Sequence, residues 1–314
     1  MRKTSFALIG VGVVGERIIN QLLNHESSEI LAIYDGNKTR LEEVASKYKL
    51  PVVQNVEELF KMKPDWVYIG TPPVSHASLA EQAASFGLNI LSEKPLAHNT
   101  VDGVKMVDAA EKANIHTAMH FPMMYSPVVQ KLKEAIANEE LGKIVRVELH
   151  TYFPVWPRPW QQNPWIGTRE QGGFIREVFP HYLQLMHYLF GDLEIQSHEI
   201  IYPENEELCE TGVTALAKTE SGVPVLLNGL SGIGQKERLE FKVFGTTKVM
   251  TIRNWSELWV SEEGEEAVQV IPELKPLSLI DACHGLIKGD EVLTVSFEEE
   301  LKIQRWIDDL LSIS

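Results

Sequence analysis

The apolar residues 6–9 run directly into residues 10–15, whose glycine spacing has the chemistry of a dinucleotide site. Gly10 allows a tight turn, Gly12 lets the backbone approach a pyrophosphate, and Gly15 lets the following helix pack closely on the strand. The N-terminus of that helix offers unpaired N–H groups and a partial positive charge to phosphates. The motif therefore predicts cofactor contacts from Gly10, Gly12, Val13, Val14 and Gly15.

Asp35 supplies the acidic residue that such a motif requires, twenty positions after Gly15 and at the end of an expected strand over 29–34. Its carboxylate can accept hydrogen bonds from the ribose hydroxyls, and it would repel a 2′-phosphate. We therefore expect NAD as the cofactor. NADP is the alternative, because Lys38 and Arg40 could bind a 2′-phosphate.

The elements around this motif alternate between strand and helix signals from residue 1 to about residue 120. Val14, Ile18 and Leu22 form one apolar stripe, which predicts a helix over 13–24. A buried strand is expected over 65–69. Such alternation is typical of parallel strands joined by crossover helices, with ligands at the carboxyl ends of the strands. We therefore predict a dinucleotide-binding Rossmann domain over residues 1–120.

Beyond about residue 140 the apolar residues recur at every second position. Apolar and polar residues alternate over 145–150, 213–218, 239–243 and 249–253, which predicts a mainly antiparallel sheet with one buried face. An amphipathic helix closes the chain at about 298–312. The fold class is thus α/β, with an α+β domain over residues 121–314 for substrate binding and oligomerisation. We expect the substrate cleft between the two domains.

The composition excludes several classes of protein. The chain has 314 residues, is 44% hydrophobic, and has a net charge of −15 and a pI near 5.2. Nucleic-acid binding needs a basic surface, so no such partner is expected. No apolar run is long enough to span a bilayer. Cys209 and Cys283 are far apart and suggest neither a disulfide framework nor a metal site. We expect a cytoplasmic protein without membrane contact.

Three further motifs follow the glycine motif in order, at residues 71–76, 92–96 and 171–181. Together the four resemble the Gfo/Idh/MocA oxidoreductases, whose pattern has TPxxxH, then EKP, then a glycine pair leading to D-x-x-x-H. The resemblance covers nearly the whole chain. The matching residues are Thr71, Pro72, His76, Glu93, Lys94, Pro95, Gly172, Gly173 and His181.

This resemblance implies an NAD(P)-dependent enzyme that transfers a hydride between the nicotinamide and a secondary alcohol or ketone of a sugar, polyol or related small molecule. His181 suits the role of proton acceptor, because imidazole titrates near neutral pH. Lys94 can stabilise developing alkoxide charge and competes as the base. Glu177 could orient His181 from the same helix face or hold a substrate hydroxyl, unless Pro180 starts or kinks that helix. The family also assigns cofactor contacts to Thr71, Pro72, His76, Glu93 and Lys94.

The chain departs from the family pattern where the substrate is expected. Glu177 replaces the family aspartate, Phe179 replaces a glycine, and residues 121–127 lack arginine. The aromatic residues of 151–165 could stack on a sugar from a loop that its prolines make stiff, or they could cover a domain junction or a subunit contact. The residues assigned to substrate binding are Lys94, Tyr125, Arg158, Trp160, Arg176, Glu177 and His181.

Two other functions are compatible with the same resemblance. One is an NAD-dependent glycoside hydrolase, which would release sugar without net NADH. The other is a non-enzymatic dinucleotide sensor, although Lys94 and His181 are both present. A homodimer or homotetramer formed through the C-terminal sheet is also expected.

Overall fold

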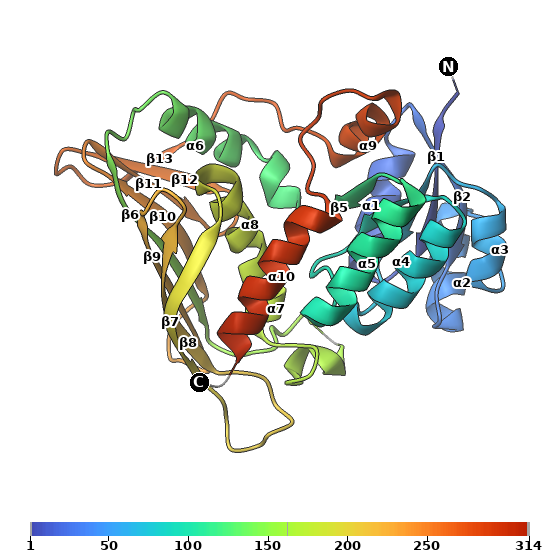
Figure 1. The fold of residues 1–314 in the computed structure, drawn as a ribbon, viewed down its shortest axis with the longest axis horizontal. Helices are drawn as coiled ribbons and strands as arrows, with labels where there is room; N and C mark the ends of the chain where they lie inside the picture. The colour runs from blue at the N-terminus through green and yellow to red at the C-terminus, as the bar shows by residue number, and fades with distance from the viewer. Residues whose placement is uncertain (1, 162, 313–314) are drawn as a thin grey trace. The chain divides into compact units, whose positions relative to one another are not determined.

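The computed structural model describes residues 2–161 and 163–312 and divides the chain into two compact units (Figure 1). The first unit contains the chain up to His120 together with Ser278–Gln304. The second contains Phe121–Leu277 and the chain from Arg305 onward.

The first unit is built on a five-stranded parallel sheet in the order β2-β1-β3-β4-β5. The expected Rossmann arrangement is therefore confirmed. Because β2 and β3 flank β1 on opposite sides, the chain reverses its winding at β1, and ligands bind at such a switch point. The strands are β1 (Thr4–Ile9), β2 (Ser28–Tyr34), β3 (Trp66–Ile69), β4 (Asn89–Ser92) and β5 (Thr117–Met119).

Helices cover the faces of this sheet, and α4 and α5 lie side by side (Figure 1). Asparagine caps three of the helices: the side chains of Asn37, Asn55 and Asn99 each accept a hydrogen bond from a first-turn backbone N–H. The helices are α1 (Val13–Leu23), α2 (Lys38–Tyr48), α3 (Val56–Lys61), η1 (Pro73–Ser75), α4 (His76–Ser85), α5 (Thr100–Ala113) and α9 (Leu279–Lys288).

The segment Ser278–Gln304 belongs with the first unit, whereas the sequence analysis assigned it to the second domain. Two contacts explain the grouping. The Trp66 indole N–H donates to the carbonyl oxygen of Cys283 at 3.2 Å, and the Met119 N–H donates to that of Val295 at 2.8 Å. The returning chain thus contacts the parallel sheet at the start of β3 and at the end of β5.

The second unit is built on an eight-stranded sheet in the order β13-β12-β11-β10-β6-β9-β8-β7. All pairs are antiparallel except β6 with β9, so the expected mainly antiparallel sheet is confirmed. The strands are β6 (Ile144–Phe153), β7 (Leu193–Ile201), β8 (Gly212–Thr219), β9 (Pro224–Ser231), β10 (Arg238–Gly245), β11 (Lys248–Arg253), β12 (Glu257–Glu262) and β13 (Val268–Val270).

Short helices pack on this sheet through aromatic side chains. The rings of Tyr182 and Phe241 stack with centroids 6.2 Å apart. Gly229 on β9 allows close approach, since a Cβ atom there would run into the ring of Phe174. The helices are η2 (Pro122–Tyr125), α6 (Pro127–Ala137), η3 (Pro164–Gly167), α7 (Phe174–Glu177), α8 (Phe179–Phe190) and α10 (Phe297–Leu311), of which α10 joins this unit from Arg305.

Glu177 and His181 do not share one helix, so the expected common helix face is wrong. Glu177 ends α7, and α8 begins at Phe179 with Pro180 in its first turn. Proline lacks a backbone N–H and is tolerated in the first turn of a helix but not in its interior. The sequence Phe179-Pro180 therefore ends one helix and starts another.

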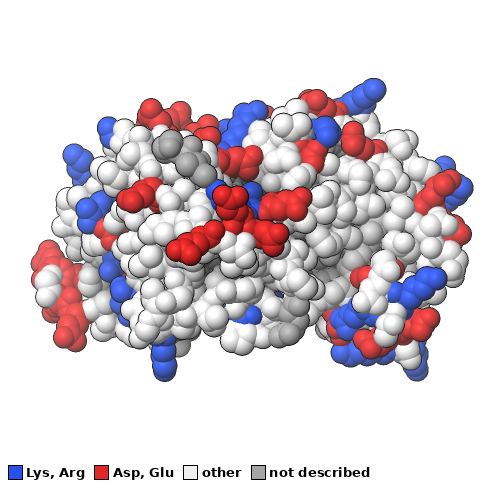
Figure 2. Space-filling model, turned by 90° about the horizontal axis from the view of Figure 1, so that it is seen from below, with Lys and Arg blue, Asp and Glu red and all other residues white. Residues whose placement is uncertain are grey.

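Charged side chains of both signs appear on the face shown in Figure 2, and acidic ones gather near its middle and at its left edge. Across residues 2–161 and 163–312, the helices are all too short or too polar to cross a bilayer.

Candidate active site

The glycine motif has the geometry of a phosphate cradle. Gly10 has φ +90°, and a Cβ atom there would run into the backbone of Gly70; at Gly15 it would run into the carbonyl oxygen of Gly10. Gly12 is exposed, and a Cβ atom on it would meet nothing within 4 Å. The first and third glycines are thus required for packing, whereas the second leaves open space at the start of α1. These residues fit the pyrophosphate of a dinucleotide.

Asp35 closes the same turn from the end of β2. Its two carboxylate oxygens accept hydrogen bonds from the N–H groups of Val11 and Asn37, each at 2.8 Å. Arg40 is already engaged: its Nε donates to the carbonyl oxygen of Val11 at 2.9 Å, and its guanidinium pairs with Glu16. Hydrogen bonds from Lys47 and Arg40 lower the pKa of Glu16 to about 2.

The turn that carries Lys94 is fixed by a buried carboxylate. Glu93 Oε1 accepts hydrogen bonds from the Tyr68 hydroxyl at 2.8 Å and from Nδ1 of His120 at 2.6 Å. Burial alone would raise the pKa of Glu93, but the charge and hydrogen bond of His120, aided by Tyr68, outweigh it and lower the pKa. Lys94 itself is part-exposed between the buried residues Glu93 and Pro95.

His76 connects this turn to the Thr71 segment. The imidazole is fully buried, with Nε2 2.8 Å from the carbonyl oxygen of Thr71 and Nδ1 3.1 Å from that of Pro95. Burial lowers the pKa of His76, although the surrounding carbonyl oxygens act to raise it. His76 therefore holds two motifs together, and its predicted contact with the cofactor stays a prediction.

Glu300 on α10 is a residue of this site that the sequence analysis missed. It is fully buried, and the nearby charge of Lys94 acts to lower its pKa. Burial raises the pKa of Glu300 well above its usual range. One turn later, Gln304 Oε1 accepts a hydrogen bond from the Ala97 N–H at 3.4 Å, so α10 runs beside the turn over 94–97. No local sequence signal marks Glu300, because Lys94 lies more than 200 residues away in the chain.

In the second unit, the His181 imidazole contacts two aromatic rings. Its centroid is 5.4 Å from that of Phe121 and 5.2 Å from that of Trp255, both nearly perpendicular to it. His181 and Glu177 are both part-exposed. The sequence analysis gave Trp255 no role.

The glycine pair before α7 is shaped by Glu210, which sequence reasoning also missed. Glu210 is buried and accepts a hydrogen bond from the Ile175 N–H at 2.7 Å. Gly173 has φ +96°, and a Cβ atom there would run into the Glu210 carboxylate. Burial raises the pKa of Glu210 to about 7. A single acidic residue in a loop gives no local sequence signal, because only the fold brings it to Gly173.

Four of the residues assigned to substrate binding differ in how accessible their side chains are to a ligand. The Arg158 guanidinium is buried and donates to both carboxylate oxygens of Glu237, at 3.0 and 3.1 Å. Arg176 donates to the carbonyl oxygens of its own loop. Tyr125 is buried, whereas Trp160 is 60% exposed. Of the four, Trp160 is the most open to a ligand.

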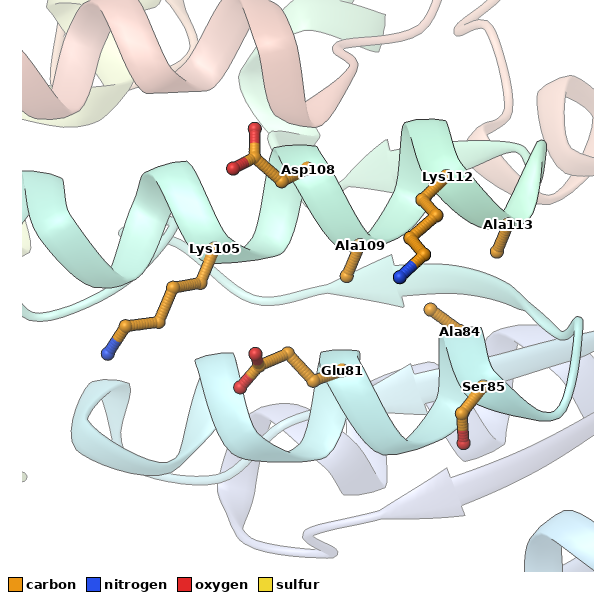
Figure 3. Close-up of a pocket in the computed structure, with 8 residues that line it drawn as sticks. All are labelled: Glu81, Ala84, Ser85, Lys105, Asp108, Ala109, Lys112 and Ala113. Carbon is orange, nitrogen blue, oxygen red and sulfur yellow. The ribbon is translucent and has the colours of Figure 1, made fainter.

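The structure brings the glycine motif, Thr71 and the end of β3 together in the first unit, since Gly10 packs against the backbone of Gly70 and Thr71. Lys94 belongs to the first unit, and Glu177 and His181 belong to the second. Their approach to one substrate stays a prediction. A separate groove between α4 and α5 contains none of the predicted site residues (Figure 3).

Comparison with known proteins identifies the family. Residues 4–121 match the family model described as oxidoreductase family, NAD-binding Rossmann fold, and residues 129–251 match that of the GFO/IDH/MocA C-terminal domain. The chain belongs to the Gfo/Idh/MocA family. The first unit is thus the NAD-binding Rossmann domain of a family of oxidoreductases.

Relatives with named activities are distant. Glucose-6-phosphate 3-dehydrogenase from Bacillus subtilis is 25% identical over 58% of this chain and 53% of that protein. D-apiose dehydrogenase from Paraburkholderia graminis is 26% identical over 69% of this chain and 58% of that protein. The chain thus spans somewhat more than half the length of these two relatives.

Solved structures match over nearly the full length. The WlbA dehydrogenase from Bordetella pertussis, solved with NADH and UDP-GlcNAcA, is 21% identical and has a TM-score of 0.84. The match covers 98% of this chain and 95% of that one. At this identity the likeness shows a common fold.

The open space at Gly12 gives a first prediction. Gly12 has φ −63°, which alanine adopts readily, so Gly12→Ala should leave the thermal stability unchanged. Its methyl group would occupy the approach to the pyrophosphate, so the NADH dissociation constant should rise at least about tenfold. Gly234→Ala, where a Cβ atom also meets nothing within 4 Å, is the matched control. Wild-type NADH affinity in Gly12→Ala would contradict the phosphate-cradle assignment.

The pKa of Glu210 gives a second prediction. A carboxyl whose pKa is raised on folding stabilises the fold fully below its unfolded pKa, near 4.5, and this stabilisation is lost as the pH rises through about 7. The wild type should therefore lose up to about 3 kcal/mol relative to Glu210→Gln between these pH values. Thermal unfolding at a series of pH values measures this difference. Glu206→Gln, exposed in the same loop, should follow the wild type throughout. A Glu210→Gln curve parallel to the wild-type curve would rule out the raised pKa.

Proposed function

We propose that the protein is an NAD-dependent dehydrogenase or reductase that transfers a hydride between the nicotinamide and a secondary alcohol or ketone of a sugar or sugar derivative. One observation carries this proposal. Lys94 stays part-exposed on a turn whose neighbours are buried and hydrogen-bonded on both sides. Such support is expected where a charge must be held in a fixed direction.

The roles of the residues follow from their chemistry. When bound, the dinucleotide supplies the hydride acceptor or donor. Lys94 would donate a hydrogen bond to the substrate oxygen and stabilise its negative charge as alkoxide character develops. His181 would hold the proton that leaves the substrate hydroxyl in the oxidation direction and return it in the reverse direction. Glu177, at the end of α7, would hold a neighbouring substrate hydroxyl.

The substrate class is supported by the named relatives, which act on glucose 6-phosphate and D-apiose, and by the 60% exposed indole of Trp160. An aromatic face suits the apolar face of a sugar ring. Purified protein should reduce NAD with at least one member of a panel containing glucose 6-phosphate, D-apiose and UDP-GlcNAcA. Release of the sugar from a glycoside without net NADH would instead favour the glycoside hydrolase, and NADH binding without either reaction would favour the sensor.

The Lys94 assignment gives a third prediction. Lys94→Ala should lower kcat by about 10²-fold or more, because alkoxide stabilisation is lost in the transition state. NADH affinity should change little. His181→Ala should also lower kcat, and the two effects should not add if both residues serve one proton-transfer step. Lys112→Ala, on the exposed surface of α5, is the control. Near wild-type kcat in Lys94→Ala would remove the catalytic assignment.

Cofactor preference gives a fourth prediction. Asp35 would repel a 2′-phosphate, and Arg40 is occupied by Glu16 and Val11, so NADH should bind more tightly than NADPH. Asp35→Ala should weaken NADH binding and narrow the preference. Fluorescence quenching measures both dissociation constants. Tighter binding of NADPH to the wild type would contradict this preference.

We also propose a dimer or tetramer formed through the sheet of the second unit, and this is the fifth prediction. Leu216 on β8 is 53% exposed and Ile201 on β7 is 49% exposed, so one face of these strands retains apolar surface. Light scattering at micromolar concentration should give the mass of two or four chains. Leu216→Glu should lower this mass, whereas Val101→Glu, at a 67% exposed position of α5, should not. A monomeric wild type would refute the assembly.

A further inference from the structure

Trp255 occupies a backbone position that normally requires glycine. It lies in the tight turn between β11 and β12, where the Ser256 N–H donates to the carbonyl oxygen of Arg253 at 3.2 Å. The two central residues, Asn254 and Trp255, have φ +48° and +74°. A hairpin turn with positive φ at both central residues is the type I′ turn, in which asparagine is common first and glycine second. Tryptophan therefore holds this conformation at an energetic disadvantage.

The side chain of Trp255 accounts for its presence. The indole stacks on the Tyr182 ring with centroids 5.2 Å apart and an interplanar angle of 24°. It also meets the His181 imidazole at 5.2 Å and 85°. Tyr182 in turn stacks on Phe241 of β10. Trp255 thus connects the hairpin to the first turn of α8, at the residue proposed to be the base.

The turn that presents the indole is itself anchored. The Asn254 N–H donates to the carbonyl oxygen of Leu239 on β10 at 3.1 Å, and its side-chain amide donates to Glu257 at 3.0 Å. The Phe121 ring also contacts the imidazole, at a centroid distance of 5.4 Å and an interplanar angle of 86°. The two perpendicular rings limit rotation of the His181 side chain about its χ angles.

We infer that Trp255 is a positioning residue, which holds the His181 imidazole in the orientation that proton transfer requires. This inference rests on the proposed function, in which His181 exchanges a proton with a substrate hydroxyl. Proton transfer requires a donor–acceptor distance near that of a hydrogen bond, so a freely rotating imidazole would reach it in only a fraction of its conformations. The unfavourable φ of Trp255 is the local cost of this restraint.

Two other roles would have different kinetic signatures. If Trp255 were a platform for the substrate ring, its removal would raise KM and leave kcat unchanged. If it only packed the hydrophobic core, its removal would lower stability and leave both constants unchanged. A positioning role lowers kcat and leaves KM and NADH affinity nearly unchanged.

The test uses three variants of the full chain. Trp255→Gly removes the indole and installs the residue that the turn favours, so the variant should fold. Trp255→Phe keeps an aromatic ring. Trp259→Phe is the matched control, because Trp259 lies on the same hairpin and contacts Arg253 and Glu257. With the panel sugar that gives the highest rate, kcat should fall at least about tenfold in Trp255→Gly and be largely restored in Trp255→Phe.

A chemical measurement tests the contact without any substrate. Diethyl pyrocarbonate modifies exposed imidazoles, and mass spectrometry reports the rate at His181 alone. This rate should rise several-fold in Trp255→Gly and stay near the wild-type rate in Trp255→Phe and Trp259→Phe. An unchanged rate in Trp255→Gly, or a raised KM with unchanged kcat, would overturn the inference.

The two measurements also separate this inference from the proposed function. If His181→Ala keeps wild-type turnover, the proposed base is wrong, whatever the modification rates are. If His181→Ala loses turnover but Trp255→Gly keeps the wild-type kcat, the base is correct and the positioning role fails.

Discussion

The buried carboxylate of Glu93 is the interaction on which the first unit's site depends. A carboxylate without partners in a protein interior costs several kcal/mol, so it must be paired and hydrogen-bonded. Tyr68 and His120 supply those partners from β3 and from the end of β5, on either side of β4. Moving Glu93 would leave all three groups unsatisfied. The hydrogen bonds of Glu93 thus fix the backbone from which the adjacent, part-exposed Lys94 leaves the sheet.

In the second unit, the turn into α7 is also held by a buried carboxyl group, but its pKa shifts in the opposite direction. Glu210 accepts a hydrogen bond from the Ile175 N–H and fills the space left by Gly173, which fixes the turn into α7 and hence the position of Glu177. The groups around Glu210 offset less of the effect of burial on its pKa than the groups around Glu93 do. The pKa of Glu210 therefore rises to about 7, whereas that of Glu93 falls. The first turn is thus held by a charge and the second by a carboxyl that is partly protonated near neutral pH.

Local features of the sequence predicted the fold and part of the site. The glycine motif could be predicted because each steric requirement is met within a few residues of the motif or at the neighbouring strand end, as at Gly10 and Gly15. Pro180 predicted either the start of a helix or a kink, because the missing N–H of proline is a local property of the sequence. The structure has the helix start. Glu210 and Glu300 could not be predicted, because their partners lie 35 and more than 200 residues away. The return of Ser278–Gln304 to the first unit depends on similarly long-range contacts.

At Trp255 the sequence rules for hairpin turns fail, and the reason is physical. The pair Asn254-Trp255 does not read as a type I′ turn, because only a glycine in the second position would signal one. Folded proteins violate local preferences mostly where another interaction compensates. Here the compensation is the indole's contact with Tyr182 and His181, two residues that adjoin the break at Pro180. The unfavourable turn and the interrupted helix thus meet at the same imidazole.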